Sequence, residues 1–268
     1  MWKGLNSRFI RGYLCASKVK DLKKIRVGAV SYLNTKPLLY GIRRNRVMKD
    51  IELIEDYPAN IAKMLTANRI DVGLIPMAAT SKLSAWHVVG DCCIGCDGPV
   101  ASVGIFSDVP LEETEKVILD YQSRTSVSLA RILLKEYWKK EVLFVDASGE
   151  DYRGMIKGSV AGVVIGDRAL EQRSRSPYFY DLGEAWKHHT GLPFVFAAWI
   201  ANKELPTDFE ELFNEANQEG LLHIDDVVRE NTNEFYDLKR YFSENIDYMF
   251  DSRKKEALAL FLNKLSYY

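Results

Sequence analysis

The sequence predicts an α/β fold, and two observations lead to this prediction. Short apolar runs rich in β-branched residues alternate with segments in which apolar side chains recur at helical spacing. Hydrophobic residues make up 47% of the 268 residues and charged residues 27%, as in an ordinary globular protein that forms one large domain or two lobes. Strands separated by helices pair in parallel, and ligands of such folds bind beyond the carboxyl ends of the strands.

The first strand–helix unit is predicted at residues 25–41. Ile25–Val30 has the composition of a buried strand, and a helix can begin at Pro37, whose missing N–H costs nothing in the first turn. Ser31, Asn34 and Thr35 lie between them, so backbone N–H groups and the positive end of the helix dipole would face a bound anion. The alternative interpretation is an ordinary capped turn.

A second set of elements follows at residues 51–80. Ile51–Ile54 and Asp71–Pro76 are predicted strands, with a helix from Pro58 between them, and Met77–Thr80 leads into another predicted helix. Four candidate ligand contacts lie at the carboxyl ends of the first and third strands: Ser31, Asn34, Pro76 and Met77.

Two segments have the character of crossings between lobes. Val100–Phe106 is a long apolar run after the Asp97-Gly98-Pro99 turn, and Leu192–Ile200 is a long aromatic strand. These crossings divide the chain into a first lobe of residues 25–105 plus 197–268 and a second lobe of residues 106–196.

A second anion receptor is predicted after the strand Val117–Asp120. Ser123, Thr125 and Ser126 follow it directly and precede a helix. Arg124 has the chemistry to pair bidentately with a carboxylate, or to bridge to a surface acid. We expect the Ser/Thr cluster to contribute more to ligand binding than the arginine side chain.

The strand Ala161–Asp167 ends in two residues with different predicted roles. Gly166 allows close backbone approach, and Asp167 is predicted to be the N-cap of the next helix. His188 and His189 precede Thr190-Gly191 at a predicted helix end, where they are either C-terminal caps or general bases. From Pro206 onward, the sequence predicts only helices, which pack back on a lobe already made.

Several function classes are disfavoured by charge and composition. The formal net charge of −1 gives no support for a nucleic-acid surface. No apolar run is long enough to span a membrane, and Met1–Lys24 is basic but irregular, so we expect a cytoplasmic protein with a disordered N-terminal extension at residues 1–24. The four cysteines, at 15, 92, 93 and 96, lack a second ligand pair, which favours reduced structural thiols and no metal site.

Six motifs together resemble the chorismate dehydratase family, the first enzyme of the futalosine route to menaquinone. The resemblance spans residues 25–265 and implies a type II periplasmic-binding-protein-like fold: two α/β lobes, two crossing segments and a ligand cleft between the lobes. Cys96 departs from the small residue expected there. The motifs are VGAVSYLNTKPLLYG (27–41), DVGLIP (71–76), DGPVASV (97–103), DYQSRTSV (120–127), VIGDRAL (164–170) and DLGEAWKHHTGLPFVFAAW (181–199).

The resemblance implies a hydro-lyase that converts chorismate to 3-[(1-carboxyvinyl)oxy]benzoate without a metal or other cofactor. Because the receptor motifs contain no histidine or glutamate, we hypothesise that the enolpyruvyl carboxylate of the substrate removes the proton, with His188 or His189 as the alternative base. Asn34 and Ser102 are the predicted catalytic residues, orienting the substrate and its leaving hydroxyl. The predicted substrate contacts are Ser31, Thr35, Pro76, Met77, Gly98, Ser123, Arg124, Thr125, Ser126 and Gly166.

Three other functions fit parts of the pattern. A small-anion solute-binding protein shares the implied fold but needs an export signal, which Met1–Lys24 does not convincingly supply. The later enzyme of the same pathway, which makes a dihydroxynaphthoate, needs a histidine base in the cleft. A ligand-sensing regulator needs a DNA-binding helix pair, for which the N-terminus is too short. The oligomeric state stays open.

Overall fold

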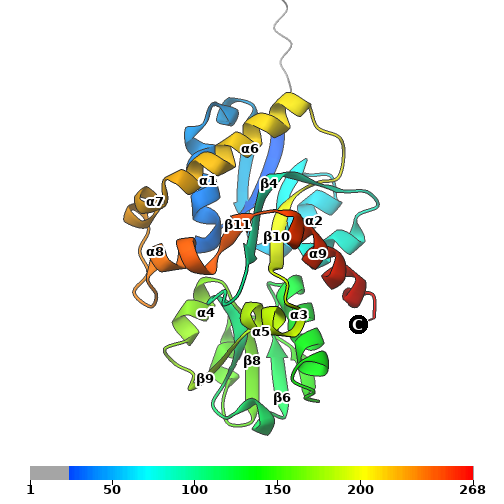
Figure 1. Ribbon diagram of the computed structural model, residues 1–268, viewed down its shortest axis with the longest axis vertical. Coiled ribbons are helices and arrows are strands. Elements are labelled where there is room, and N and C mark those ends of the chain that lie inside the picture. The colour runs from blue at the N-terminus through cyan, green and yellow to red at the C-terminus, as the bar shows by residue number, and fades with distance from the viewer. Residues whose placement is uncertain (1–23, 268) are drawn as a thin grey trace, which may run out of the picture.

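The computed structural model describes residues 24–267 and has two lobes, each built on its own β-sheet (Figure 1). The prediction of a disordered extension at residues 1–24 falls, apart from Lys24, outside the described residues. No helix among the described residues is long and apolar enough to cross a membrane.

The first lobe contains a six-stranded sheet in the order β11-β4-β10-β3-β1-β2. β1, β2 and β3 run parallel, whereas β10 pairs antiparallel with both β3 and β4. The strands are β1 (Ile25–Val30), β2 (Ile51–Asp56), β3 (Val72–Pro76), β4 (His87–Cys96), β10 (Phe194–Ala201) and β11 (Asp247–Met249). The helices of this lobe are α1 (Lys36–Arg44), α2 (Pro58–Thr66), α6 (Thr207–Leu222), α7 (Ile224–Glu230), α8 (Leu238–Arg240) and α9 (Ser252–Leu265).

The second lobe contains a five-stranded sheet in the order β7-β6-β8-β5-β9. β6 pairs parallel with β7 and β8, and β5 pairs antiparallel with β8 and β9. The strands are β5 (Val103–Ser107), β6 (Lys116–Leu119), β7 (Leu143–Asp146), β8 (Val160–Ile165) and β9 (Tyr178–Asp181), and the helices are α3 (Arg124–Glu136), α4 (Asp167–Gln172) and α5 (Leu182–Thr190).

The chain crosses between the two sheets at residues 97–102 and 191–193. The sequence places lobe boundaries at 105/106 and 196/197, whereas β5 already belongs to the second sheet from Val103 and β10 to the first sheet from Phe194. The α/β fold with two crossings is confirmed, and the division into lobes falls a few residues earlier at both crossings.

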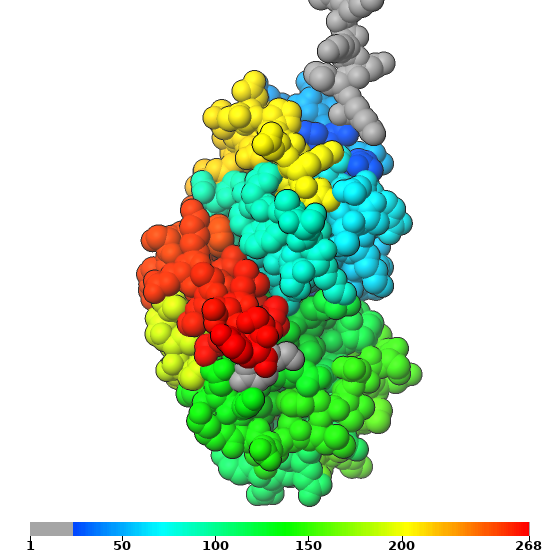
Figure 2. Space-filling model, turned by 90° about the vertical axis from the view of Figure 1, so that its right-hand side faces the viewer, coloured from blue at the N-terminus to red at the C-terminus, as the bar shows by residue number. Residues whose placement is uncertain are grey.

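The C-terminal helix α9 lies over the junction of the lobes, where Figure 2 shows the red end of the chain between cyan and green residues. Lys264 of α9 pairs with Glu136 of α3, and Arg253 pairs with Asp97 of the first crossing at 3.1 Å. Asp97 also pairs with Lys187 of α5. These ion pairs tie the crossing and both lobes together on one side of the molecule.

Helix α6 packs on α1 with their backbones in contact. A Cβ built at Gly41 would lie 1.9 Å from the carbonyl oxygen of Ala216, and one built at Gly220 would lie 1.9 Å from that of Pro37. Only glycine fits at both positions. This close crossing fixes α1, whose first turn follows Asn34 and Thr35, against the C-terminal part of the chain.

Met77–Lys82, where the sequence predicts the start of a helix, is a 3-10 helix. Two local predictions are wrong. Residues 206–268 are not all helical, because Asp247–Met249 forms β11 at the edge of the first sheet and Tyr241–Asn245 is a π-helix. Gly166, not Asp167, is the N-cap of α4; Asp167 instead accepts a hydrogen bond from the N–H of Leu33 in the first lobe.

Three of the four cysteines lie among the described residues. Cys92, Cys93 and Cys96 are free and buried in β4. Burial raises the pKa of Cys92 to about 12 and raises those of the other two thiols as well, so all three stay protonated. Among residues 24–267, no group of three or more His, Cys, Asp or Glu side chains is arranged to hold a metal ion.

Candidate active site

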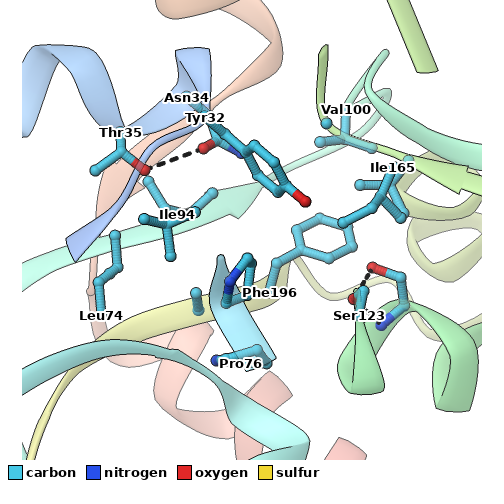
Figure 3. A pocket seen from close by; sticks show the side chains of 16 residues that line it. Tyr32, Asn34, Thr35, Leu74, Pro76, Ile94, Val100, Ser123, Ile165 and Phe196 are labelled. Carbon is cyan, nitrogen blue, oxygen red and sulfur yellow. Dashed lines mark hydrogen bonds between the residues drawn. The ribbon is translucent and has the colours of Figure 1, made fainter. Parts of the chain in front are cut away.

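A cavity lies between the two lobes at the carboxyl ends of β1, β3 and β8 (Figure 3). The volume of the cavity is about 60 Å³, and part of it is open to solvent. Its lining residues are Val30, Tyr32, Asn34, Thr35, Pro58, Leu74, Pro76, Ile94, Val100, Val103, Ser123, Ser126, Ile165, Gly166, Phe196 and Ala197.

The first lobe supplies an amide and two hydroxyls through the turn after β1. Tyr32 donates its phenol proton to Oε1 of Gln122 in the second lobe. The hydroxyl of Thr35 donates to Oδ1 of Asn34 over 3.3 Å, the contact dashed in Figure 3. Burial raises the pKa of Tyr32 above its ordinary value, so this phenol is a hydrogen-bond donor and not a base.

The second lobe supplies the N-terminus of α3. Ser123 is the N-cap: its Oγ accepts from the backbone N–H of Ser126 at 3.1 Å and donates to Oγ of the same residue at 2.9 Å. The first amide groups of a helix have no acceptor inside it, and the helix dipole adds positive potential there. This end of α3 is therefore suited to hold an anionic group without a charged side chain.

The rest of the lining is apolar, and the sequence analysis did not single out these residues. Tyr32 and Phe196 direct their rings into the same space, beside Ile165 and Val100 (Figure 3). Phe196 lies in the aromatic run that predicts a crossing, and Tyr32 lies between Ser31 and Asn34. The position of each residue in the sequence indicates that it lies near the cavity, but it does not show whether the side chain points into it.

Six of the predicted contacts line the cavity, namely Asn34, Thr35, Pro76, Ser123, Ser126 and Gly166. Ser31 is exposed and Met77 is buried, and neither lines the cavity. Thr125 accepts the N–H of Ala78 at 3.0 Å, which joins the lobes, and Ser102 accepts the hydroxyl proton of Tyr241 at 2.7 Å. These two hydroxyls and Gly98 lie outside the lining.

Arg124 lines an adjoining groove with Lys63 and Lys82. The two hollows are neighbours, because the groove residues Ala59 and Arg124 each follow a cavity residue in the chain. No ion pair joins these three cations to a carboxylate of the described residues, and no acidic side chain lines the groove. The groove is thus a patch of positive charge beside the cavity.

The histidine candidates for acid–base chemistry lie away from the cavity. His188 and His189 are in the last turn of α5, which ends at Gly191 in the left-handed conformation, as predicted. The Nε2 of His189 lies 3.2 Å from a carboxylate oxygen of Glu136. Asp97 holds the crossing through its ion pairs. The lining contains no histidine, carboxylate or amine side chain.

Three direct hydrogen bonds connect the lobes around the cavity. Besides the Tyr32–Gln122 and Ala78–Thr125 bonds, Asp167 Oδ1 accepts the Leu33 N–H at 3.0 Å. Desolvation raises the pKa of Asp167, although this backbone hydrogen bond opposes the rise. The cavity is therefore enclosed by two lobes in direct contact.

Two α/β lobes, two crossings and a cavity between the lobes define a protein of the periplasmic-binding-protein-like class. Solved structures agree at the level of fold. Protein AF1704 from Archaeoglobus fulgidus matches with a TM-score of 0.70 at 15% identity, covering 91% of this chain and 97% of that chain. The Candida albicans CA3427 gene product, described as having the generic periplasmic binding protein fold, matches with a TM-score of 0.59 at 13% identity over 90% of this chain and 91% of its own.

Within this class, the chain belongs to the menaquinone biosynthesis family, whose model matches residues 25–267. Two relatives carry the name chorismate dehydratase. The protein from Thermus thermophilus is 26% identical over 228 residues, 75% of this chain and 79% of the relative. The protein from Campylobacter jejuni is 24% identical over 243 residues, 88% of this chain and 95% of the relative.

Proposed function

We propose that this protein is a chorismate dehydratase, a hydro-lyase that eliminates water from chorismate to give 3-[(1-carboxyvinyl)oxy]benzoate. Family membership and the names of the two relatives support this function. The main structural support is that the cavity is lined only by neutral groups and lies between the N-termini of α1 and α3. Such a site suits a reaction whose driving force, aromatisation of the ring, is already present in the substrate.

The two carboxylates of chorismate are proposed to bind at opposite lobes. One meets the hydroxyls and free amides at the start of α3, near Ser123 and Ser126; the other meets the turn that carries Asn34 and Thr35. The six-membered ring packs against the apolar wall that includes Phe196 and Ile165. In this arrangement each carboxylate of chorismate meets hydrogen-bond donors, and the ring meets apolar side chains.

The elimination breaks one C–H and one C–O bond of the ring. The carbon that bears the ether oxygen loses a proton, its neighbour loses hydroxide, and the electron pair forms the last double bond of the benzene ring. Since no histidine, carboxylate or amine lines the cavity and Tyr32 stays protonated, the enolpyruvyl carboxylate of the substrate is proposed to accept the proton. The resulting carboxylic acid passes this proton to the departing hydroxide, which leaves as water, and the carboxylate is regenerated.

The protein's contribution is then positioning and hydrogen bonding. Holding an internal base against the C–H bond can supply about 7–11 kcal/mol of barrier lowering. Asn34 is proposed to donate to the substrate as charge shifts toward the leaving hydroxyl. Ser102 is proposed to support this arrangement from behind the cavity wall, since its hydroxyl contacts Tyr241.

The test is incubation of the purified protein with chorismate, with separation and mass measurement of the aromatic product. Asn34→Ala should lower kcat by about 10²-fold, because it removes a donor that acts in the transition state, and should change KM much less. Product formation by Asn34→Ala at a rate within a fewfold of the unmodified protein would refute the role of Asn34. Chorismate binding without any turnover would instead favour a small-anion binding protein of the same fold.

A further inference from the structure

Tyr32 of the first lobe is held across the cavity by a side chain of the second lobe. Its hydroxyl donates to Oε1 of Gln122, and its ring, which points into the cavity in Figure 3, lies against Gly166. The other two hydrogen bonds that join the lobes here use backbone N–H groups of the first lobe, from Leu33 and Ala78. Of these three bonds, only the Tyr32–Gln122 bond joins two side chains, so a change of rotamer is enough to break it.

The amide of Gln122 is buried and its orientation is fixed by its neighbours. Besides the Tyr32 hydroxyl, Oε1 accepts from Nη2 of Arg168 at 2.9 Å. The Nε2 of the same amide donates to the hydroxyl of Tyr121 at 2.7 Å and to Glu150 at 3.2 Å. Because arginine has no acceptor atom, a rotated amide would set its N–H groups against the guanidinium. The oxygen of Gln122 therefore stays turned toward Tyr32.

Arg168 is in turn fixed by Asp120, the residue that follows β6. Its Nη2 lies 2.9 Å from Oδ2 of Asp120, whose side chain has no exposed surface. The hydroxyl of Tyr152 donates to the same oxygen at 2.8 Å, and the backbone N–H of Gln122 donates to Oδ1 at 2.8 Å. Separating this ion pair would leave a buried charge without a partner, which is costly. Arg168 is thus a rigid support for the Gln122 amide.

We propose that Gln122 and Arg168 are positioning residues that hold the Tyr32 ring as one wall of the substrate cavity. Neither residue lines the cavity, so both act through Tyr32, which does. The assignment of the cavity to chorismate rests on the proposed function. Because the Tyr32 ring is uncharged, it contacts the substrate about equally before and during the reaction. Its placement therefore contributes to substrate binding and not to the chemical step.

The first experiment measures kcat and KM of Tyr32→Phe, Gln122→Met and the double variant with chorismate. Phenylalanine keeps the ring and removes only the hydroxyl that anchors it. Loss of this neutral hydrogen bond should raise KM about fivefold and leave kcat within about twofold. Since both substitutions break the same bond, the KM of the double variant should not exceed the larger single value. A Tyr32→Phe KM within about twofold of the unmodified value, or single effects that multiply, would overturn the proposal.

The part of Arg168 is tested with Arg168→Lys. Lysine keeps a positive charge beside Asp120, but its ammonium ends one bond short of Nη2, the atom that contacts both Asp120 and Gln122. The KM of this variant should rise as in Gln122→Met, with kcat again within about twofold. An unchanged KM would show that Arg168 does not position the amide. If Gln122→Met or Arg168→Lys fails to fold, as shown by its melting curve, Tyr32→Phe decides the question alone.

The matched controls change the same residue types within one lobe. Tyr40→Phe removes a hydroxyl that contacts Asp226 of the first lobe at 3.3 Å. Gln172→Met replaces a glutamine that is 4% exposed, as Gln122 is, and that donates to Ser176 of the second lobe at 3.0 Å. Both controls should keep KM within about twofold. A rise in KM equal to that of the test variants would show a general loosening of the fold and refute the proposal.

A second measurement is independent of turnover. In protein whose tyrosines carry ¹³C at Cζ, the Tyr32 signal can be assigned by its loss in Tyr32→Phe. The chemical shift of this carbon depends on the hydrogen bond of the hydroxyl, so the signal should move in Gln122→Met and stay in place in Gln172→Met. An unmoved signal in Gln122→Met would refute the proposal even if chorismate were not the substrate. A moved signal without any chorismate turnover would support the hold on Tyr32 and refute the proposed function.

Discussion

Gly166 of the second lobe lies beside the ring of Tyr32, which comes from the first lobe. Its φ of +65° is a conformation that other residues rarely adopt, and a Cβ built on it would lie 3.2 Å from two carbons of the Tyr32 ring. The residue therefore combines a backbone constraint with a steric one. Both depend on the absence of a side chain where the lobes meet.

Gly166→Ala should weaken both folding and substrate binding. The backbone strain should lower the free energy of unfolding by about 1–3 kcal/mol, and displacement of the Tyr32 ring should raise KM. Urea unfolding and steady-state kinetics measure the two effects. Gly158→Ala is the control, since Gly158 also has a positive φ of +58° but no atom within 4 Å of an added Cβ. It should lose stability with unchanged KM; an unchanged KM in Gly166→Ala would contradict the steric role.

At this scale, sequence analysis predicts residue types better than side-chain directions. The turn after β1 was recognised from Ser31, Asn34 and Thr35, yet Ser31 is exposed and its neighbour Tyr32 faces the cavity. Similarly, Thr125 lies in the predicted Ser/Thr cluster but uses its hydroxyl to join the lobes. Which side of a turn a side chain takes depends on packing with distant segments, which one sequence does not reveal.

Asp71 illustrates how neighbouring strands are joined at the level of elements. Its carboxylate, 7% exposed, accepts from the backbone N–H of Arg26 at 2.8 Å and from the guanidinium at 2.7 Å, and it pairs with Lys203 at 2.6 Å. Burial by itself would raise the pKa of Asp71, but the hydrogen bonds from Arg26 and Lys203 outweigh it and hold this pKa well below its usual range. The start of β1, the start of β3 and the residues after β10 meet at this carboxylate.

This arrangement predicts a specific acid sensitivity. A carboxylate whose pKa is lowered by folding stabilises the fold above its unfolded pKa of about 3.9, and that stability is lost as the pH falls below about 4. Asp71→Asn should therefore lose about 2 kcal/mol at pH 7 and show a flatter decline in unfolding free energy below pH 4 than the unmodified protein. Asp225→Asn, which removes an exposed partner of Lys239, is the control and should match the unmodified protein. Parallel curves for Asp71→Asn and the unmodified protein would contradict this assignment.

Most strands and long helices could be predicted because each carries its own periodic signal. The runs at 25–30, 72–76 and 160–165 are apolar and β-branched, and they form buried strands. β11 could not be predicted, since Asp247–Met249 is too short for an alternating pattern. The π-helix before it depends on packing of Tyr241 in the interior and has no sequence signature.

For the whole molecule, the cationic groove gives the near-neutral protein a local attraction for anions. Lys63 and Lys82 come from the first lobe and Arg124 from the second, beside the cavity. The prediction of Arg124 as a substrate contact stays untested, and its place in the groove suggests a role in encounter. Opposite charges raise association rates most at low ionic strength, where screening is weak.

Replacing Lys63, Lys82 and Arg124 together by glutamine should lower kcat/KM for chorismate about tenfold at low ionic strength and leave kcat nearly unchanged. The dependence of kcat/KM on salt should also flatten. Replacing Lys24, Arg46 and Lys49, which line a different groove of the first lobe, makes the same change in net charge and is the control. Equal losses in both triple variants would show that net charge, not the groove, is responsible.

The two-lobed organisation was predictable because both crossings carry long apolar runs, at residues 100–106 and 192–200. The predicted lobe boundaries lie a few residues after the observed ones. The reason is that a strand that enters a sheet directly after a crossing has the same composition as the crossing itself. β5 and β10 are such strands. The hydrogen bonds from Tyr241, Asn245 and Tyr248 to the first crossing and to the backbone of Asn34 were not predicted, since a helical tail can pack on either lobe.

The order of strands in the first sheet has a consequence for synthesis of the protein. β10 pairs between β3 and β4, so the edges of both strands stay open while the ribosome makes the roughly one hundred residues that separate β4 from β10. The second lobe, continuous over residues 103–190, can close its own sheet during that interval. A nascent chain stalled before residue 194 therefore presents the unpaired edge of β3 and both edges of β4, because β11 is also still to be made, and its survival depends on how soon translation resumes.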